Sequence, residues 1–188
     1  NRASRSRRPW GTSSLRRDQP RRSTDDAPNG PATTTAGRGL PYHPRTPWTS
    51  SGDGGPAKEA HLSWGGSVAV MGDGSVVLSD VCRVRKIAPA GIIRTIVGTG
   101  TCAAAIPGRR GTESPISSRA VSVAKDGKTI YISTYAQVVK LDAAGIVSVV
   151  AGTGTAGTSG DGGPATQAEL YGVGVTAPAS DGSLYIAD

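Results

Sequence analysis

Short apolar runs alternate with turn sequences in the chain after residue 65. The first run of each set leads to an Asp-Gly pair, which favours a β-hairpin because a type I′ turn needs positive φ at both central residues. A second apolar run follows directly. The third run alternates partly between apolar and polar residues, as a strand half exposed to solvent does, and an Ala-Gly pair separates it from the fourth. The pairs are Asp73-Gly74, Asp126-Gly127, Asp181-Gly182, Ala90-Gly91 and Ala144-Gly145.

These runs recur with a period of 54 residues. The segment 91–100 is similar to 145–154, and the hexapeptide Gly-Asp-Gly-Gly-Pro-Ala occurs twice, two periods apart. A period near 50 residues is typical of repeat architectures. The two hexapeptides comprise Gly52, Asp53, Gly54, Gly55, Pro56 and Ala57, and Gly160, Asp161, Gly162, Gly163, Pro164 and Ala165.

Four short strands joined by tight hairpins form an antiparallel meander sheet, which has to stack on neighbours because it does not bury both faces alone. Radial stacking of such units makes a β-propeller. The sequence therefore predicts an all-β fold, a partial β-propeller of four-stranded blades at about 66–100 and 119–154, with part of a third at 171–188. A closed propeller has about 4–8 blades, so we expect a fragment of a larger protein.

The residues also resemble a known family, the NHL-repeat β-propellers. The resemblance is carried by Gly-Asp-Gly-Gly-Pro-Ala-Thr-Gln-Ala-Glu-Leu (160–170) and Leu-Tyr-Ile-Ala-Asp (184–188), and it extends over 48–188. It implies a binding or sensor module. The chain departs from the family pattern in the middle inter-blade loop, 107–115, which has lost Asp-Gly-Gly-Pro. It departs again at Val81-Cys82-Arg83 and Tyr135-Ala136-Gln137, where a Thr-Gly-Asn-His-like turn is usual. At least one blade is therefore expected to be degenerate.

The net charge of +7 belongs to the N-terminal segment. Residues 1–47 hold ten Arg and three Asp, whereas 48–188 hold equal numbers of basic and acidic residues. Because 1–47 is rich in Arg, Pro and Ser and poor in apolar residues, it is predicted to be a disordered basic segment before the propeller. The neutral propeller argues against nucleic-acid binding there. No apolar run approaches the ~18 residues of a membrane helix.

The two Gly-rich loops and the histidines are weak candidates for a metal site. Calcium takes about 6–8 oxygen ligands, and each loop offers a single carboxylate, Asp53 or Asp161. We expect a structural role instead, in which Gly supplies unusual φ, Pro stiffens the loop exit and Asp bonds the loop backbone. His43 and His61 have no neighbouring ligand cluster in the sequence. No metal or cofactor is expected.

Two alternatives are open for Cys82 and Cys102. A hairpin about residues 90–91 places position 82 opposite about 99, so Cys102 lies near the same edge. A disulfide is geometrically feasible and implies an oxidising compartment. Two unlinked thiols are the favoured alternative.

We expect a non-enzymatic repeat scaffold that binds a protein or carbohydrate ligand as part of a larger protein. This follows from a repeat scaffold without converging His, Asp or Glu in the sequence. One alternative is a propeller-type lyase or hydrolase whose catalytic residues lie outside this fragment. A second alternative is an RNA-binding NHL propeller, which the Arg-rich segment favours and the neutral repeat region opposes.

Overall fold

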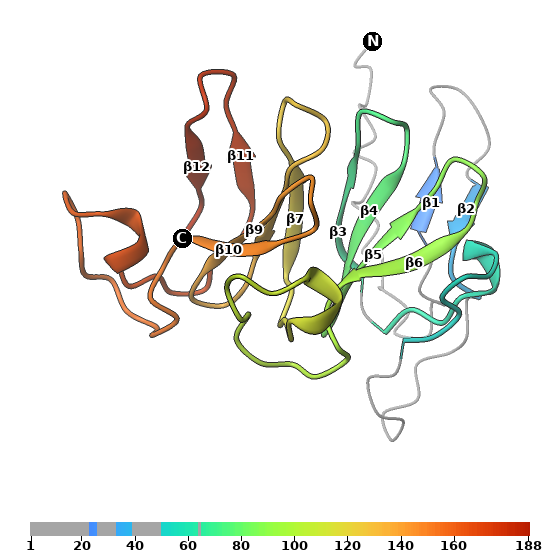
Figure 1. The fold of residues 1–188 in the computed structure, drawn as a ribbon, viewed down its shortest axis with the longest axis horizontal. Coiled ribbons are helices and arrows are strands. Elements are labelled where there is room, and N and C mark those ends of the chain that lie inside the picture. Colours follow the sequence, from blue (N-terminus) through green and yellow to red (C-terminus); the bar gives the residue numbers. More distant parts are fainter. Residues whose placement is uncertain (1–22, 26–32, 39–49, 64) are drawn as a thin grey trace, which may run out of the picture.

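The computed structural model describes residues 23–25, 33–38, 50–63 and 65–188, and this part is nearly all β (Figure 1). Three single-turn 3-10 helices, η1 (Ala57–Glu59), η2 (Gly111–Glu113) and η3 (Ala165–Gln167), lie between the sheets. The strands are β1 (Ser23–Asp25), β2 (Thr33–Ala36), β3 (Gly65–Val70), β4 (Val76–Asp80), β5 (Arg83–Ile87), β6 (Ile93–Val97), β7 (Ala120–Val123), β8 (Ile130–Ser133), β9 (Val138–Leu141), β10 (Val147–Ala151), β11 (Thr176–Pro178) and β12 (Leu184–Ile186).

Two complete blades, β3–β6 and β7–β10, are antiparallel meanders in sequence order. The Asp-Gly turns close their first hairpins, where Val70 pairs with Val76 and Val123 pairs with Ile130. Strands β11 and β12 pair as the first hairpin of a further sheet. The predicted all-β fold of four-stranded antiparallel blades is confirmed.

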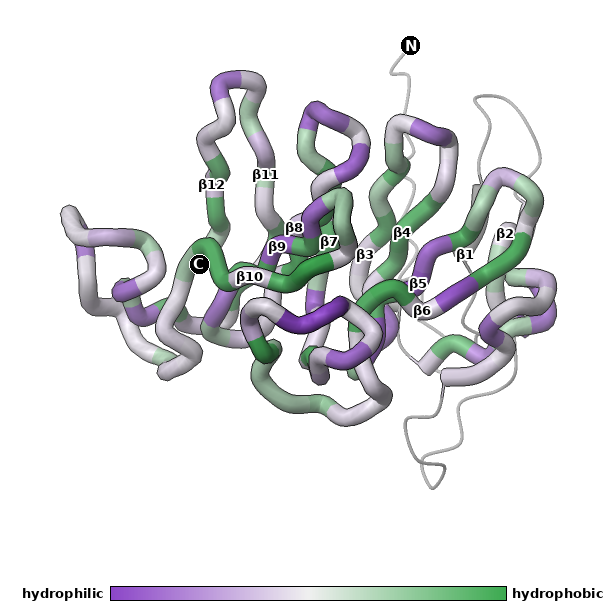
Figure 2. Tube along the Cα trace, in the orientation of Figure 1, coloured by the Kyte–Doolittle hydropathy of each residue, from purple (hydrophilic) through white to green (hydrophobic). Residues whose placement is uncertain are grey.

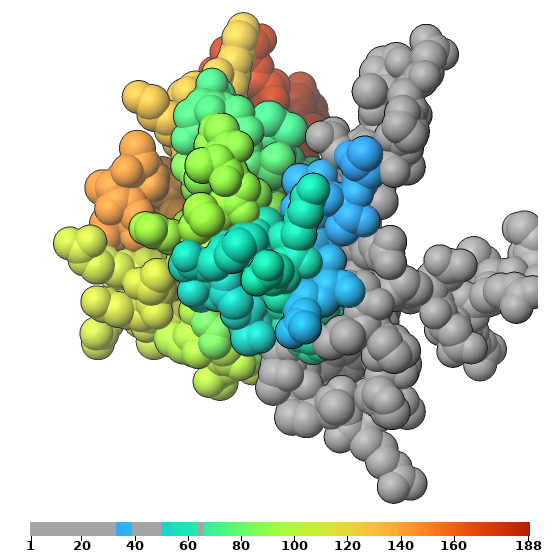
Figure 3. All heavy atoms as spheres, turned by 90° about the vertical axis from the view of Figure 1, so that its right-hand side faces the viewer, coloured from blue at the N-terminus to red at the C-terminus, as the bar shows by residue number. Residues whose placement is uncertain are grey.

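Strands β1 and β2 form a two-stranded sheet within the range expected to be disordered. Strand β2 occupies the position that β6 and β10, the last strands of the complete blades, occupy relative to the following 3-10 helix. It is followed by Gly37, whose N–H donates to Ala57 at 2.9 Å, just as Gly98 donates to Gly111 at 3.0 Å. Figure 3 shows residues 33–38 (blue) against residues 50–63 (teal). The structure thus has strands within 23–25 and 33–38 of the segment expected to be disordered, and the rest of 1–47 lies outside the described residues.

The 54-residue period misses this copy because its link is longer. Gly37 precedes its partner Ala57 by 20 residues, whereas Gly98 precedes Gly111, and Gly152 precedes Ala165, by 13. Seven extra residues therefore shift β2 out of the repeat register. The strand is also Thr-Thr-Thr-Ala, without the Val and Ile that mark the other strands.

The core lies between the stacked blades. Val77 of β4 packs in one cluster with Ile130, Ile132 and Leu141 of the next blade. The adjacent residue Leu78 points to the opposite face and packs in a cluster with Ala36, Ala57 and Ala60, because successive side chains of a strand alternate between faces. Figure 2 shows hydrophobic residues along much of the strands and hydrophilic ones at the β3–β4, β7–β8 and β11–β12 turns. Both faces of β4 are therefore covered.

Hydrogen bonds join the first two strands of one complete blade, β3 and β4, to the start of β7 in the next. The Ser67 hydroxyl accepts from the Val121 N–H at 2.6 Å, and the Ser79 hydroxyl donates to the Arg119 carbonyl at 3.1 Å. Gly66 lies within this contact, where an added Cβ would collide with the Arg119 carbonyl and lie 2.6 Å from the Ser79 hydroxyl oxygen. The close approach of β3 to the next blade therefore requires glycine here.

Large apolar side chains remain exposed on the outer faces of the described sheets. Val68 is 57% exposed and pairs with Leu78, on the face turned away from β7–β10. Tyr185 is 67% exposed, and its neighbours Leu184 and Ile186 turn to the opposite face and pack toward β7–β10. Where two described sheets stack, the equivalent faces are covered by the neighbouring sheet.

Gly66→Ala is expected to lower the free energy of unfolding by about 1–3 kcal/mol, the usual cost of overpacking. The matched control is Gly55→Ala, whose Cβ would meet only the Gly52 carbonyl oxygen at an ordinary 3.5 Å. Urea unfolding of both variants measures the difference. Equal stabilities of the two variants would contradict the close approach at Gly66.

Candidate functional site

A buried arginine connects the first Gly-rich loop to the sheet behind it. The Arg85 guanidinium, fully buried on β5, donates to Asp53 at 2.7 Å and to the equally buried Asp80 at 3.2 Å. The second Asp53 oxygen accepts the Thr95 hydroxyl at 2.7 Å. The expectation that Asp53 bonds the loop backbone is therefore wrong, because its carboxylate binds the side chains of Arg85 and Thr95 in the sheet. A buried charge is costly unless it is paired, so this carboxylate compensates Arg85.

The second complete blade replaces the whole charged set. At intervals of 54 residues, Pro107 stands for Asp53, and the buried Val139 stands for Arg85. The loss of the signature in the middle loop is therefore accompanied by loss of the cation that needed it. In the last copy, Asp161 is exposed and makes no hydrogen bond or ion pair with described residues.

Glycine in the loop signature has a steric cause. Gly52 has φ of 92° and Gly160 has φ of 103°, which is left-handed backbone that favours glycine. A Cβ at Gly52 would also lie 2.8 Å from the Ala60 Cα, and one at Gly160 would lie 2.7 Å from the Ala168 Cα. These loops are shaped by close backbone approach.

Cys82 and Cys102 are joined in a disulfide, with their Cα atoms 4.6 Å apart. Unlinked thiols, the alternative that the sequence favoured, are not what the structure contains. The bond ties the segment after β6 to the two-residue turn between β4 and β5, where Val81 has a φ of 51°. A β-branched residue is strained in this left-handed region, so the disulfide lies beside a strained turn.

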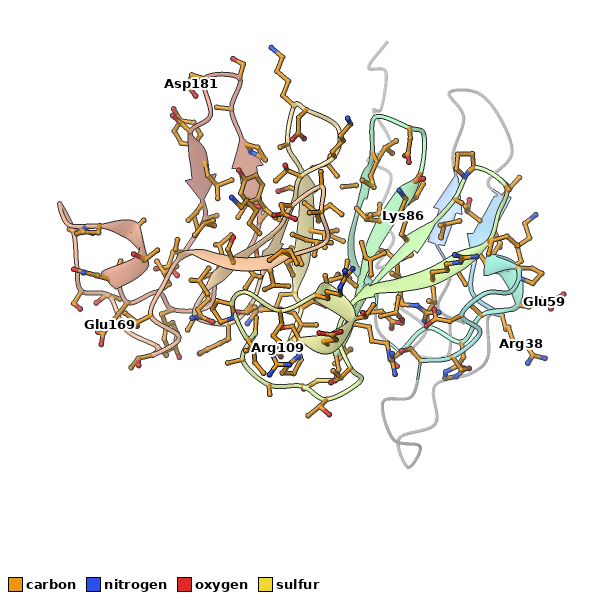
Figure 4. All side chains as sticks on the ribbon, in the orientation of Figure 1. Arg38, Glu59, Lys86, Arg109, Glu169 and Asp181 are labelled. Carbon is orange, nitrogen blue, oxygen red and sulfur yellow. A yellow bond between two sulfur atoms is a disulfide. The ribbon has the colours of Figure 1, made fainter. Side chains whose placement is uncertain are left out.

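A groove of about 710 Å³ lies between the two complete blades. The β3–β4, β7–β8 and β9–β10 turns form its walls, together with β5, β6 and the start of η2. Apolar side chains line it, namely Met71, Ile96, Ile130 and Leu141. This volume is typical of ligand sites, which combine an apolar lining with a few polar groups. Figure 4 labels Lys86 on β5 and Arg109 on the link between β6 and β7.

Three carboxylates in the groove are engaged by the turns that carry them. The Ser75 N–H and the Lys86 ammonium lower the pKa of Asp73 to about 2. The Thr129 hydroxyl and the N–H groups of Lys128 and Thr129 lower the pKa of Asp126 to about 2. Asp142 accepts the Ile146 N–H at 2.8 Å. These acids therefore shape turns.

Three cations line the same groove, and among the described residues Lys86 alone of the three forms an ion pair. Lys86 pairs with Asp73 at 2.9 Å. The exposed side chains of Arg110 and Lys128 make no hydrogen bond or ion pair with other described residues. Sequence reasoning missed this groove, although Arg110, which lines it, stands in the middle loop where the other two copies have proline.

The remaining sequence candidates do not form a chemical centre in the described part of the chain. His43 lies outside the described residues, and the His61 backbone bridges to Ser51. Within the ranges that the structure describes, no three His, Cys, Asp or Glu side chains are grouped to hold a metal ion. Among these residues there is also no helix of the length and hydropathy needed to cross a membrane.

Comparison with known proteins places the chain among propeller-like repeats. A family model for the teneurin NHL domain matches residues 23–118, from β1 through the first complete blade and η2. A crystal structure of a protein of unknown function from Bacteroides thetaiotaomicron is similar, at 26% identity and a TM-score of 0.53. The similarity covers 62% of this chain and 30% of that chain, so this chain spans less than a third of that protein's length. No curated protein matches the chain.

Asp53→Ala is expected to lower the free energy of unfolding by about 1.5–3 kcal/mol, because it removes charge-assisted hydrogen bonds from a buried guanidinium. The matched control is Asp161→Ala, in the same hexapeptide, whose carboxylate has no partner among the described residues. Chemical denaturation measures both. Equal losses would show that Asp53 acts within its loop rather than on Arg85.

Lys86→Gln is expected to raise the pKa of Asp73 above about 2 and to leave that of Asp126 at about 2. The Ser75 N–H still lowers the pKa of Asp73 in the variant, so the rise stops short of the ordinary 3.8. Because both pKa values are depressed, the stability that these acids contribute is present above pH about 4. It is lost as the pH falls through about 2. Carboxyl NMR titration measures both values, and an unchanged Asp73 would contradict the ion pair.

Proposed function

The chain belongs to the teneurin NHL domain family, and from this premise we propose that it is a repeat scaffold that binds a protein ligand in the groove between its two complete blades. Membership in this family supports a repeat scaffold or binding module, as the resemblance to NHL repeats predicted. NHL domains generally mediate protein interactions, which favours a protein ligand. We further propose that the scaffold begins before residue 48, because the family match starts at β1.

The groove is the observation that carries this proposal. Its apolar lining at Met71, Ile96 and Ile130 offers a place for an aliphatic side chain of a ligand. Burial of such a side chain contributes about 1.5–3 kcal/mol to binding. The described lining contains no aromatic ring on which a sugar could stack. A peptide segment therefore fits this lining better than a carbohydrate does.

The alternative activities receive less support from the groove. Asp73 and Asp126, with pKa values of about 2, stay ionised at neutral pH and are poor proton donors for a hydrolase or lyase. Three carboxylates offset the three cations of the lining, so the groove attracts the phosphates of RNA weakly. Both points favour protein binding.

Ala143→Trp is expected to block the groove. Ala143 is an exposed residue of the β9–β10 turn that lines it, so a bulky side chain there fills its mouth without entering the core. The matched control is Ala90→Trp, an exposed residue of the β5–β6 turn outside the lining. The probe is a library of random peptides displayed on phage and selected on the whole chain.

Peptides enriched on the unmodified chain are expected to bind Ala90→Trp equally and to lose at least tenfold in affinity for Ala143→Trp. Thermal unfolding at unchanged midpoints shows that both variants fold. The proposal fails if no peptide is enriched, or if the enriched peptides bind both tryptophan variants alike.

A further inference from the structure

We propose that the segment bound in this groove carries an Asp or Glu next to an apolar side chain, and that Arg110 and Lys128 bind its carboxylate at the groove mouth. This inference rests on the proposed function and specifies the ligand of the same site. It follows from two exposed cations that form no hydrogen bond or ion pair with described residues, from the engaged acids beside them and from the apolar lining.

Arg110 occupies a backbone position that does not require arginine. Its φ of −62° and ψ of 145° are close to the −60° and 130° of Pro56 and the −61° and 131° of Pro164, at the same place in the other two copies. Proline at each copy starts the 3-10 helix equally well. The preceding Arg109 likewise replaces Gly55 and Gly163. The arginine pair is therefore added charge rather than a need of the loop.

The described groove carboxylates form no ion pair with Arg110 or Lys128. The Asp126 carboxylate already accepts the N–H groups of Lys128 and Thr129, each at 2.8 Å, and the Thr129 hydroxyl at 2.6 Å. Asp73 accepts the Ser75 N–H at 2.9 Å and pairs with Lys86. Asp126 is thus held by its own turn and Asp73 by its turn and Lys86. In the described part of the chain, the side chains of Arg110 and Lys128 form no hydrogen bond or ion pair, and Lys128 acts on Asp126 only by Coulombic attraction.

Arginine and lysine suit a carboxylate ligand in this setting. The Arg110 guanidinium offers a planar fork of N–H donors that matches a carboxylate, and charge-assisted hydrogen bonds are stronger than neutral ones. The apolar side chains of Met71 and Ile96, both half-buried, lie in the same lining. Met adapts to ligand side chains of different shape. An acidic residue beside an apolar one would satisfy both parts of the groove.

The lining carries as many acids as bases, so the attraction acts at short range. We therefore expect the carboxylate to contribute specificity at contact rather than strong long-range steering. The salt dependence of binding should be modest, in contrast to the steep dependence that multiple phosphate contacts give. This property separates an acidic peptide from a nucleic acid.

The test uses one peptide enriched in the phage selection, synthesised with a fluorescent label, and a counterpart in which every Asp and Glu is replaced by Asn and Gln. Arg110→Ala and Lys128→Ala are each expected to weaken binding of the acidic peptide about fivefold or more. Arg94→Ala is the matched control, because Arg94 is exposed on β6 outside the lining. Arg110→Lys is expected to recover part of the loss. Fluorescence anisotropy gives the affinities.

The inference is overturned if the enriched peptides lack an excess of Asp and Glu, or if the amide counterpart binds equally well. It is also overturned if Arg110→Ala and Lys128→Ala bind no more weakly than Arg94→Ala. In each of these cases, continued sensitivity to Ala143→Trp would preserve the groove as a peptide site. Insensitivity to Ala143→Trp would instead remove the proposed function itself.

Discussion

Face-to-face stacking of blades is the interaction on which the rest of this structure depends. A four-stranded sheet with apolar residues on both faces is unstable in water unless both faces are covered. Val77 and Leu78, adjacent on β4, meet this need in opposite directions, one toward the next blade and one toward η1 and β2. The glycine at position 66 and the hydroxyls of Ser67 and Ser79 then fix how closely β3 and β4 approach the next blade. The groove lies where the stacked sheets end in their turns.

The copies solve one packing problem with different chemistry. In the first complete blade, a buried Arg85 is compensated by Asp53 from the preceding link and by Asp80 from its own sheet. In the second, Val139 fills the equivalent position and Pro107 replaces the acid. A buried ion pair and a well-packed apolar set can be similarly stable. A buried arginine without its acid, or a buried acid without its arginine, would be unfavourable. Neither blade contains such an unpaired charge at these positions.

The sequence predicted the repeated blades, but it missed the features that differ between copies or join distant segments. The 54-residue period and the hairpin signals yielded the blades, because each strand and turn is encoded locally. Strand β2 escaped detection since its link is seven residues longer and its residues are mostly Thr. The groove is lined by turns that are far apart in the sequence, so no single motif indicates it. The Cys82–Cys102 pairing depended on the path of the chain after β6, which strand pairing alone does not determine.

Differences between copies separate structural replacement from candidate function. At position 107 the chain loses an acid, and the loss is matched inside the fold by Val139. At positions 109 and 110 it gains two arginines on a backbone that proline or glycine supports elsewhere, and no described residue binds the Arg110 side chain. The change at position 107 is balanced by the change at position 139, so it needs no partner outside the molecule. An uncompensated charge beside an apolar groove is placed to meet one, so the loop that looks most degenerate is where a ligand is best sought.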